Sequence, residues 1–197
     1  MTRFILASSS PRRRELLAST GVEFDVIPSH IPEVRGEGEA PEEYVARLSR
    51  EKAGAIAREH HDRWIIAADT TVLYGDELLE KPVDEADARR MLATIAGRTH
   101  MVYTGVTVMN ASLDYRDTRV AETEVRMLPL DASDIEWYVG TREPMDKAGA
   151  YAAQGIGGIF IDSIHGSFTN VVGLPLALLF QMLRRAGIDP LRHDATR

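Results

Sequence analysis

The stretch RFILASSSPRRRELLAST (Arg3–Thr20) predicts a strand, a tight turn and a helix in direct succession. The run RFILAS is short and apolar, which is typical of a buried strand. Ser10 followed by Pro11 fits the N-cap and the first residue of a helix, and Gly21 fits its end. The first twenty residues therefore predict a strand–turn–helix unit.

The rest of the chain alternates strand-like and helix-like patterns without a low-complexity linker or an internal repeat. Apolar alternation and turn residues predict two antiparallel hairpins, which need no helical crossover. This mixture predicts an α/β (mixed α+β) fold, a mixed twisted sheet with flanking helices, and one domain over residues 1–197, rather than a plain doubly wound fold. The predicted elements are a strand over 22–29, a helix from Pro41, a hairpin over 63–82 with its turn at Gly75 and Asp76, a helix capped by Asp84, a hairpin over 99–128, a helix capped by Asp131 and a helix over 175–187.

The composition limits the class of protein. Lysine and arginine number 23 and aspartate and glutamate 30, so the net charge is −7, which argues against stable binding to nucleic acid or to an anionic membrane. The absence of cysteine excludes disulfides and thiolate catalysis and fits a reducing compartment. No apolar run approaches the length of a membrane span or of a signal peptide, so we expect a cytoplasmic protein.

Positive charge gathers at the first predicted helix start. Serines at 8–10 and arginines at 12–14 surround a helix N-terminus, where backbone N–H groups already favour an anion. Three arginines in a first turn oppose the helix macrodipole, so an anionic partner would remove a local conflict. The stretch predicts a phosphate cradle, with a solvated basic turn as the alternative.

Asp69 ends the apolar run WIIAAD and is the leading candidate for a general base or a metal ligand. Its alternative role is that of an ordinary aspartate at a strand end. Lys81 closes the same predicted hairpin, and Lys52 falls beside the apolar stripe of its helix, where it could reach a cleft or extend to solvent. Glu33, in a glycine- and glutamate-rich loop, is a second acid that could bind a metal ion.

The histidines show no spacing typical of a zinc site, because His60 and His61 are adjacent and no pair lies three or four residues apart on a helix. The hard oxygen donors of Glu33 and Asp69, together with substrate phosphates, would instead suit Mg²⁺ or Mn²⁺.

Six stretches, taken together and in order, resemble the Maf family of nucleoside triphosphate pyrophosphatases. The resemblance implies hydrolysis of a nucleoside triphosphate to the monophosphate and pyrophosphate with a divalent cation. It also implies a two-lobed fold around a cleft, similar to that of inosine triphosphate pyrophosphatases, and an association with septum formation. The stretches are LASSSPRRRELL, YVARLSREKA, AADTTVLYGDELLEKP, GRTH, EPMDKAGAYAAQG and NVVGLPL.

The resemblance also implies roles for individual residues. Asp69 would be the proton acceptor, Glu33 the loop acid, and both would be metal ligands. One departure is Ser9, where many family members carry glycine. The implied phosphate-side residues are Ser8, Arg13, Lys52 and Lys81, and the implied specificity residues are Arg12, Thr70 and Gln154.

Thr70 and Gln154 favour the branch that acts on dTTP and UTP over the branch that acts on 7-methyl-GTP. A non-catalytic, nucleotide-binding regulator of cell division is a second alternative. Asp69, Glu33 and Lys81 favour catalysis, because a pure sensor needs no base to activate water. The expected partner is the nucleoside triphosphate, and the oligomeric state is left open, a homodimer included.

Overall fold

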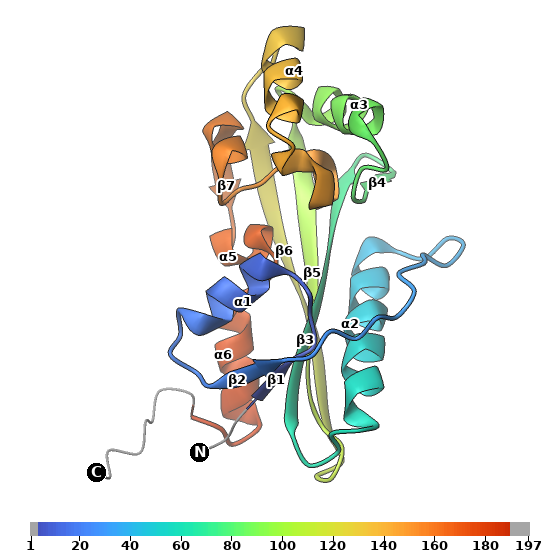
Figure 1. Cartoon of the computed structure of the whole chain (residues 1–197), viewed down its shortest axis with the longest axis vertical. Helices are drawn as coiled ribbons and strands as arrows, with labels where there is room; N and C mark the ends of the chain where they lie inside the picture. Colours follow the sequence, from blue (N-terminus) through green and yellow to red (C-terminus); the bar gives the residue numbers. More distant parts are fainter. Residues whose placement is uncertain (1–3, 190–197) are drawn as a thin grey trace. The chain divides into compact units, whose positions relative to one another are not determined.

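The computed structural model describes residues 4–189 and contains one seven-stranded mixed sheet (Figure 1). Its strand order is β2-β1-β3-β5-β6-β7, and β4 pairs with β3. Strand β1 is parallel to β2 and to β3, whereas the β3–β4 and β6–β7 pairs are antiparallel, so the predicted mixed α/β fold is confirmed. The strands are β1 (Phe4–Leu6), β2 (Phe24–Val26), β3 (Trp64–Tyr74), β4 (Glu77–Leu79), β5 (Thr99–Asn110), β6 (Tyr115–Met127) and β7 (Ile161–His165).

The helices begin where the capping residues predict. Ser10, Asp84 and Asp131 each accept a hydrogen bond from a backbone N–H of the first turn. The α-helices are α1 (Pro11–Ala18), α2 (Pro41–Ala57), α3 (Glu85–Ile95), α4 (Ala132–Gly140), α5 (Phe168–Val172) and α6 (Leu176–Arg185), and the 3₁₀ turns are η1 (Glu143–Asp146), η2 (Ala148–Ala150) and η3 (Ile156–Phe160). Among them, α5 and the 3₁₀ turns were not predicted.

The described chain divides into two compact units. The first comprises residues up to 69, 104–121 and from 173 onward, and the second comprises 70–103 and 122–172. The long strands β3, β5 and β6 each supply residues to both units. The single domain predicted for residues 1–197 stays a prediction, and Arg3 of the first predicted strand lies outside the described residues.

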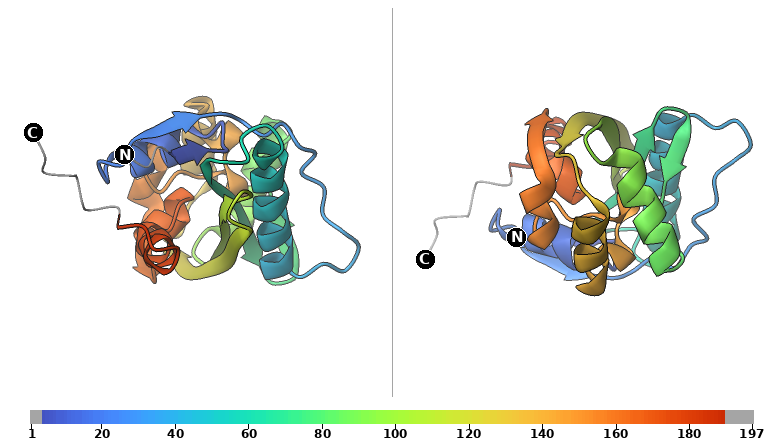
Figure 2. Two further views of the ribbon diagram at one scale, coloured as in Figure 1. Left: turned by 90° about the horizontal axis from the view of Figure 1, so that it is seen from below. Right: turned by 90° about the horizontal axis from the view of Figure 1, so that it is seen from above.

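In the first unit, helix α2 packs on the strand pair β1–β3. Figures 1 and 2 show α2 on one side of these strands and α1 with α6 on the other. Strand residues Ile65 and Ala67 point to the same face and are fully buried against the second half of α2. The partners on α2 are Ala53, Ile56 and Ala57.

Helix α2 also lies directly on β5, because Gly105 has no side chain. A Cβ atom added at Gly105 would lie 2.2 Å from the carbonyl oxygen of Val45 in α2. A methyl group there must push the helix away from the strand. The glycine therefore sets the height at which α2 sits above the sheet.

We expect Gly105→Ala to lower the free energy of unfolding by roughly 1–3 kcal/mol through overpacking. The matched control is Gly54→Ala, because Gly54 lies within α2 and has no atom within 4 Å of its added Cβ. That change should stabilise the helix by roughly 0.5–1 kcal/mol. Denaturant unfolding of both variants checks the prediction, and equal effects would show that α2 does not rest on Gly105.

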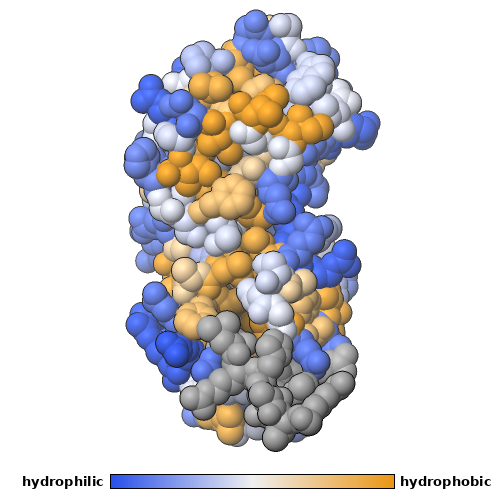
Figure 3. Space-filling view, turned by 90° about the vertical axis from the view of Figure 1, so that its left-hand side faces the viewer, coloured by the Kyte–Doolittle hydropathy of each residue, from blue (hydrophilic) through white to orange (hydrophobic). Residues whose placement is uncertain are grey.

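The second unit builds its own core from α3, α4, the 3₁₀ turns and the facing strand residues. Within it, His100 Nε2 and the Tyr151 hydroxyl share a 2.8 Å hydrogen bond. Burial lowers the pKa of His100 to about 4. Some apolar side chains of this unit stay exposed, including Trp137 and Ile159. Figure 3 shows apolar residues gathered in the upper half of the face that it draws. No helix within residues 4–189 is both long and apolar enough to cross a membrane.

Candidate active site

Asp69 lies on the face of β3 that α2 covers. Side chains alternate along a strand, so Asp69 continues the face that carries Ile65 and Ala67. Only 6% of the residue is exposed. A carboxylate in such a position needs a counter-charge or a hydrogen-bond donor, because burial removes its hydration. The helix packed on this face supplies one.

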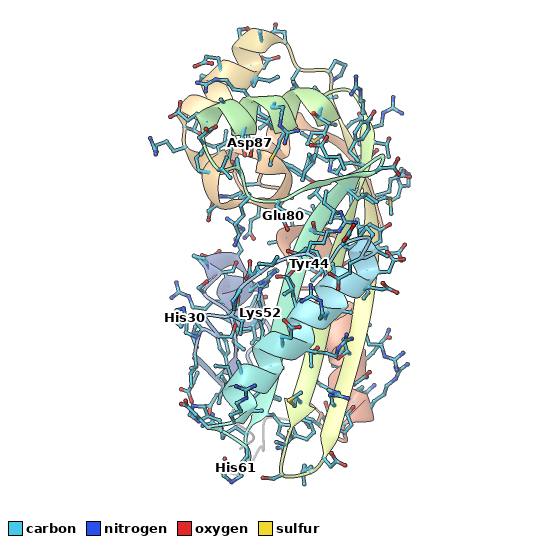
Figure 4. All side chains as sticks on the ribbon, turned by 90° about the vertical axis from the view of Figure 1, so that its right-hand side faces the viewer. His30, Tyr44, Lys52, His61, Glu80 and Asp87 are labelled. Atoms are coloured by element: carbon cyan, nitrogen blue, oxygen red, sulfur yellow. The ribbon has the colours of Figure 1, made fainter. Side chains whose placement is uncertain are left out.

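Lys52 provides that counter-charge from the second half of α2 (Figure 4). It precedes Ile56 by one helical turn, so both side chains point to the strand face. The ammonium donates to Asp69 Oδ1 at 2.6 Å, and the lysine is as buried as the aspartate. Of the two roles that the sequence leaves open for Lys52, the structure therefore excludes extension to solvent.

Glu33 reaches the same ammonium from the loop between β2 and α2. Its Oε1 atom lies 2.6 Å from Lys52 Nζ, and 40% of its side chain is exposed. One buried cation is thus held between a buried carboxylate and a half-exposed one. Glu33 and Asp69 are 36 residues apart in sequence, yet both contact the same nitrogen atom, Lys52 Nζ.

Arg13 is fixed at the start of α1. Its Nε donates to the carbonyl oxygen of Gly173 at 2.8 Å, and its Nη1 donates to Ser8 Oγ at 3.4 Å. Ser8, which is buried, also accepts a hydrogen bond from the backbone N–H of Ser10. These contacts hold Ser8 and Arg13 of the predicted phosphate cradle against each other and fix Arg13 to the backbone of Gly173.

Charges around Arg13 tie it to the two acids. Burial lowers the pKa of Arg13 below its ordinary value, whereas the negative charges of Asp69 and Glu33 raise it and Arg12 lowers it. An arginine stays protonated throughout the physiological range, so the group is a permanent cation in this cluster. We call Ser8, Arg13, Glu33, Lys52 and Asp69 the acid–base cluster; all five belong to the first unit.

The other predicted site residues are placed as follows. Arg12 lies in the first turn of α1 and is half-buried. Thr70 follows Asp69 in β3 and is also half-buried, whereas Lys81, after β4, and Gln154, before η3, are exposed. Thr70, Lys81 and Gln154 belong to the second unit. Their part in a common site stays a prediction.

The acid–base cluster offers two oxygen ligands for a divalent cation. No group of three or more acidic, histidine or cysteine side chains within residues 4–189 is arranged to hold a metal ion. Magnesium is commonly bound through one or two carboxylates and substrate phosphates rather than by a protein cage. Glu33 and Asp69 each place an oxygen 2.6 Å from the Lys52 ammonium, so their carboxylates lie near each other, and such oxygen donors are the type that Mg²⁺ prefers.

Two residues that shape the candidate site, Gly173 and Glu143, were not predicted from the sequence. Gly173, at φ 115°, offers its carbonyl oxygen to Arg13 across 160 positions of the chain. Glu143 accepts hydrogen bonds from the backbone N–H groups of Ile156 and Gly157, two and three residues after Gln154. Both residues fall within the stretches NVVGLPL and EPMDKAGAYAAQG, but only the glycines in them signal that the backbone is unusual there.

The fold is similar to solved structures of two proteins named Ham1. The Staphylococcus aureus Ham1 protein matches with a TM-score of 0.54 over 94% of this chain and 100% of that chain, at 14% identity. A HAM1 protein from Coxiella burnetii matches with a TM-score of 0.50 over the same shares, also at 14% identity. At this identity the similarity concerns the fold alone.

Sequence relatives are much more similar. A protein of Anaeromyxobacter dehalogenans named dTTP/UTP pyrophosphatase is 52% identical over 94% of this chain and 94% of its own length. Proteins with the same name from Geobacter sulfurreducens and Myxococcus xanthus are 50% and 48% identical, over 94% and 95% of this chain and 97% and 94% of their own. The family model described as Maf-like protein matches residues 3–186. With a match of this length, and with relatives about half identical from end to end, the chain belongs to the Maf family.

Proposed function

We propose that the protein is a nucleoside triphosphate pyrophosphatase that hydrolyses dTTP and UTP to the monophosphate and pyrophosphate. The name shared by its relatives supports this substrate class. The observation that carries the proposal is the buried Lys52 ammonium between Asp69 and Glu33, with Arg13 beside them. It combines a base, two cations and two oxygen ligands, which are the groups that phosphoryl chemistry requires.

The reaction begins with attack of water on the α-phosphorus. Asp69 accepts the proton of that water, because it is the carboxylate held at a fixed position on a rigid strand. Lys52 and Arg13 neutralise negative charge that develops on the phosphate oxygens, and Ser8 donates a hydrogen bond to them. Lys81 stabilises the pyrophosphate that leaves.

A divalent cation, Mg²⁺ or Mn²⁺, is the proposed cofactor, bound by Asp69, by Glu33 and by the substrate. When bound, it neutralises phosphate charge and lowers the cost of forming hydroxide from water. Within the cluster itself, Lys52 and Arg13 balance the charges of Asp69 and Glu33. A triphosphate therefore needs further positive charge, which the cation, Arg12 and Lys81 would supply.

Base selectivity is the proposed role of Gln154, with Thr70 and Arg12. A glutamine amide carries both a donor and an acceptor, so it can pair with the O4 and N3–H edge of uracil or thymine. Gln154 is exposed in the turn before η3, where its side chain is available to a ligand. A cysteine-free chain suits the reducing cytoplasm, where we expect the reaction to take place.

The test is a product analysis with UTP, dTTP, CTP and 7-methyl-GTP, each with Mg²⁺ and with Mn²⁺. We expect UTP and dTTP to yield monophosphate and pyrophosphate in one step, and chelation of the cation to stop the reaction. Diphosphate and orthophosphate as products would place the attack at the γ-phosphorus and refute the proposal. Faster turnover of 7-methyl-GTP would move the protein to that branch, and binding without turnover would indicate a regulator.

A further inference from the structure

The loop that carries Gln154 is held on both sides by one pair of side chains. Before Gln154, the backbone N–H of Ala152 donates to the Tyr138 hydroxyl at 3.0 Å. After it, the N–H groups of Ile156 and Gly157 donate to the Glu143 carboxylate at 2.9 and 2.8 Å. The Tyr138 hydroxyl itself donates to Glu143 Oε2 at 2.7 Å, which joins the two sides. We call Tyr138 and Glu143 the loop clamp.

The clamp is itself firmly placed within the second unit. Tyr138 is fully buried in α4, and its ring packs edge-on against Phe160 at 5.2 Å between centroids. Lys147 donates to the carbonyl oxygen of Glu143 at 2.6 Å. Burial opposes ionisation of Glu143, but the hydrogen bonds from Tyr138, Gly157 and Ile156 outweigh it and hold its pKa below the ordinary value. The clamp therefore holds its charge at neutral pH.

Two glycines let the backbone come this close to the clamp. A Cβ atom at Gly155 would lie 2.2 Å from Glu143 Oε1, and one at Gly157 would lie 2.3 Å from the Tyr138 hydroxyl oxygen. Gly155 has a φ of 155°, a conformation that side-chain-bearing residues rarely adopt. In the stretch AAQGIGG, Gly155 and Gly157 therefore occupy positions where the clamp leaves no room for a side chain. Gln154 stands between the two anchored ends.

We propose that Tyr138 and Glu143 are positioning residues that fix the loop of Gln154 and thereby set the base selectivity of the enzyme. The inference rests on the proposed function and deepens it. An amide discriminates well between two bases only if its donor and acceptor are held within about 0.5 Å of the positions that give good hydrogen bonds to the base edge. Three backbone hydrogen bonds on the two sides of Gln154 supply that restraint.

The test variants are Glu143→Gln and Tyr138→Phe. Glutamine keeps the size of the side chain but turns one oxygen into a donor, which then faces the N–H of Ile156 or Gly157. Phenylalanine keeps the buried ring and removes only the hydroxyl that joins the two sides. The matched control is Glu136→Gln, because Glu136 is an exposed carboxylate of α4, the helix of Tyr138, and pairs with Arg89 instead of the loop.

The measurement is kcat/KM for UTP and for CTP, with and without Gln154→Ala. Each clamp variant should lower the UTP:CTP ratio at least fivefold, whereas Glu136→Gln should leave it unchanged. In the double variants with Gln154→Ala the ratio should fall no further than in Gln154→Ala alone, because residues that act through one group are not additive. If the clamp had a purely structural role, its variants would lower kcat/KM for UTP and for CTP equally, and this loss would add to the loss caused by Gln154→Ala.

Tyr138→Phe is the milder change, so its UTP:CTP ratio tests the inference if Glu143→Gln does not fold. An unchanged UTP:CTP ratio in a folded clamp variant overturns the inference while leaving the proposed function intact. Absence of pyrophosphate release from UTP by the unaltered protein refutes the proposed function, and the selectivity role of the clamp with it.

Discussion

Replacement of Asp69 by asparagine is expected to lower kcat by roughly 10²–10⁴-fold, the range typical of a lost general base. Asparagine has the same shape, and its amide oxygen can still accept the hydrogen bond of the Lys52 ammonium. Glu33 stays beside the lysine, so the charge of Lys52 remains compensated. The variant should therefore fold while losing the group that accepts the proton.

Turnover of UTP in the presence of Mg²⁺ is the measurement, with circular dichroism and thermal unfolding as checks on folding. Asp62→Asn is the matched control, because Asp62 is an exposed aspartate just before the same strand. It should keep nearly all activity. A folded Asp69→Asn variant with near-normal kcat would remove Asp69 from the role of base and leave Glu33 as the candidate.

Much of the fold could be predicted because local signals and tertiary packing agree. Ser10, Asp84 and Asp131 are strong caps, and the helices begin at the residues that follow them. The turn at Gly75 and Asp76 gives the register in which Tyr74 faces Glu77. In each case a few neighbouring residues determine the structure.

Elements that depend on distant partners were missed. Strand β7 is short, its sequence follows a glycine-rich segment, and it exists by pairing with β6. Helix α5 is only five residues long, and its Asn170 amide donates hydrogen bonds to Val102 of β5 and Thr123 of β6. Neither shows a periodicity long enough to recognise in the sequence.

The candidate site likewise has features that could be predicted from the sequence and features that could not. Helical spacing places Lys52 one turn before Ile56, and strand alternation places Asp69 beyond Ala67, so the face on which each residue lies could be predicted. The pairing of the two residues could not, because it depends on the packing of α2 against β3. The approach of Glu33 could not be predicted either, because it lies in a loop without regular geometry. Gly173 was equally hidden, since a backbone carbonyl acts through its position and not through its residue type.

Replacement of Lys52 by methionine is expected to destabilise the fold and to abolish most activity. Methionine fits the space of the lysine stem but leaves the carboxylate of Asp69 buried without its ammonium. Removing one partner of a buried ion pair costs about 3–5 kcal/mol, because the remaining charge is uncompensated. Arg50→Met is the matched control, since it removes a cation from an exposed position of the same helix and should cost less than about 0.5 kcal/mol.

The double variant Lys52→Met/Asp69→Asn separates stability from catalysis. It contains neither buried charge, so it should recover most of the free energy of unfolding that Lys52→Met loses, while turnover stays as low as in Asp69→Asn. Denaturant unfolding of the single and double variants, together with their turnover of UTP, measures both effects. If Lys52→Met and the double variant lost the same free energy of unfolding, Lys52 would stabilise the fold through the packing of its aliphatic stem. Its charge would then not be needed to compensate the buried Asp69 carboxylate.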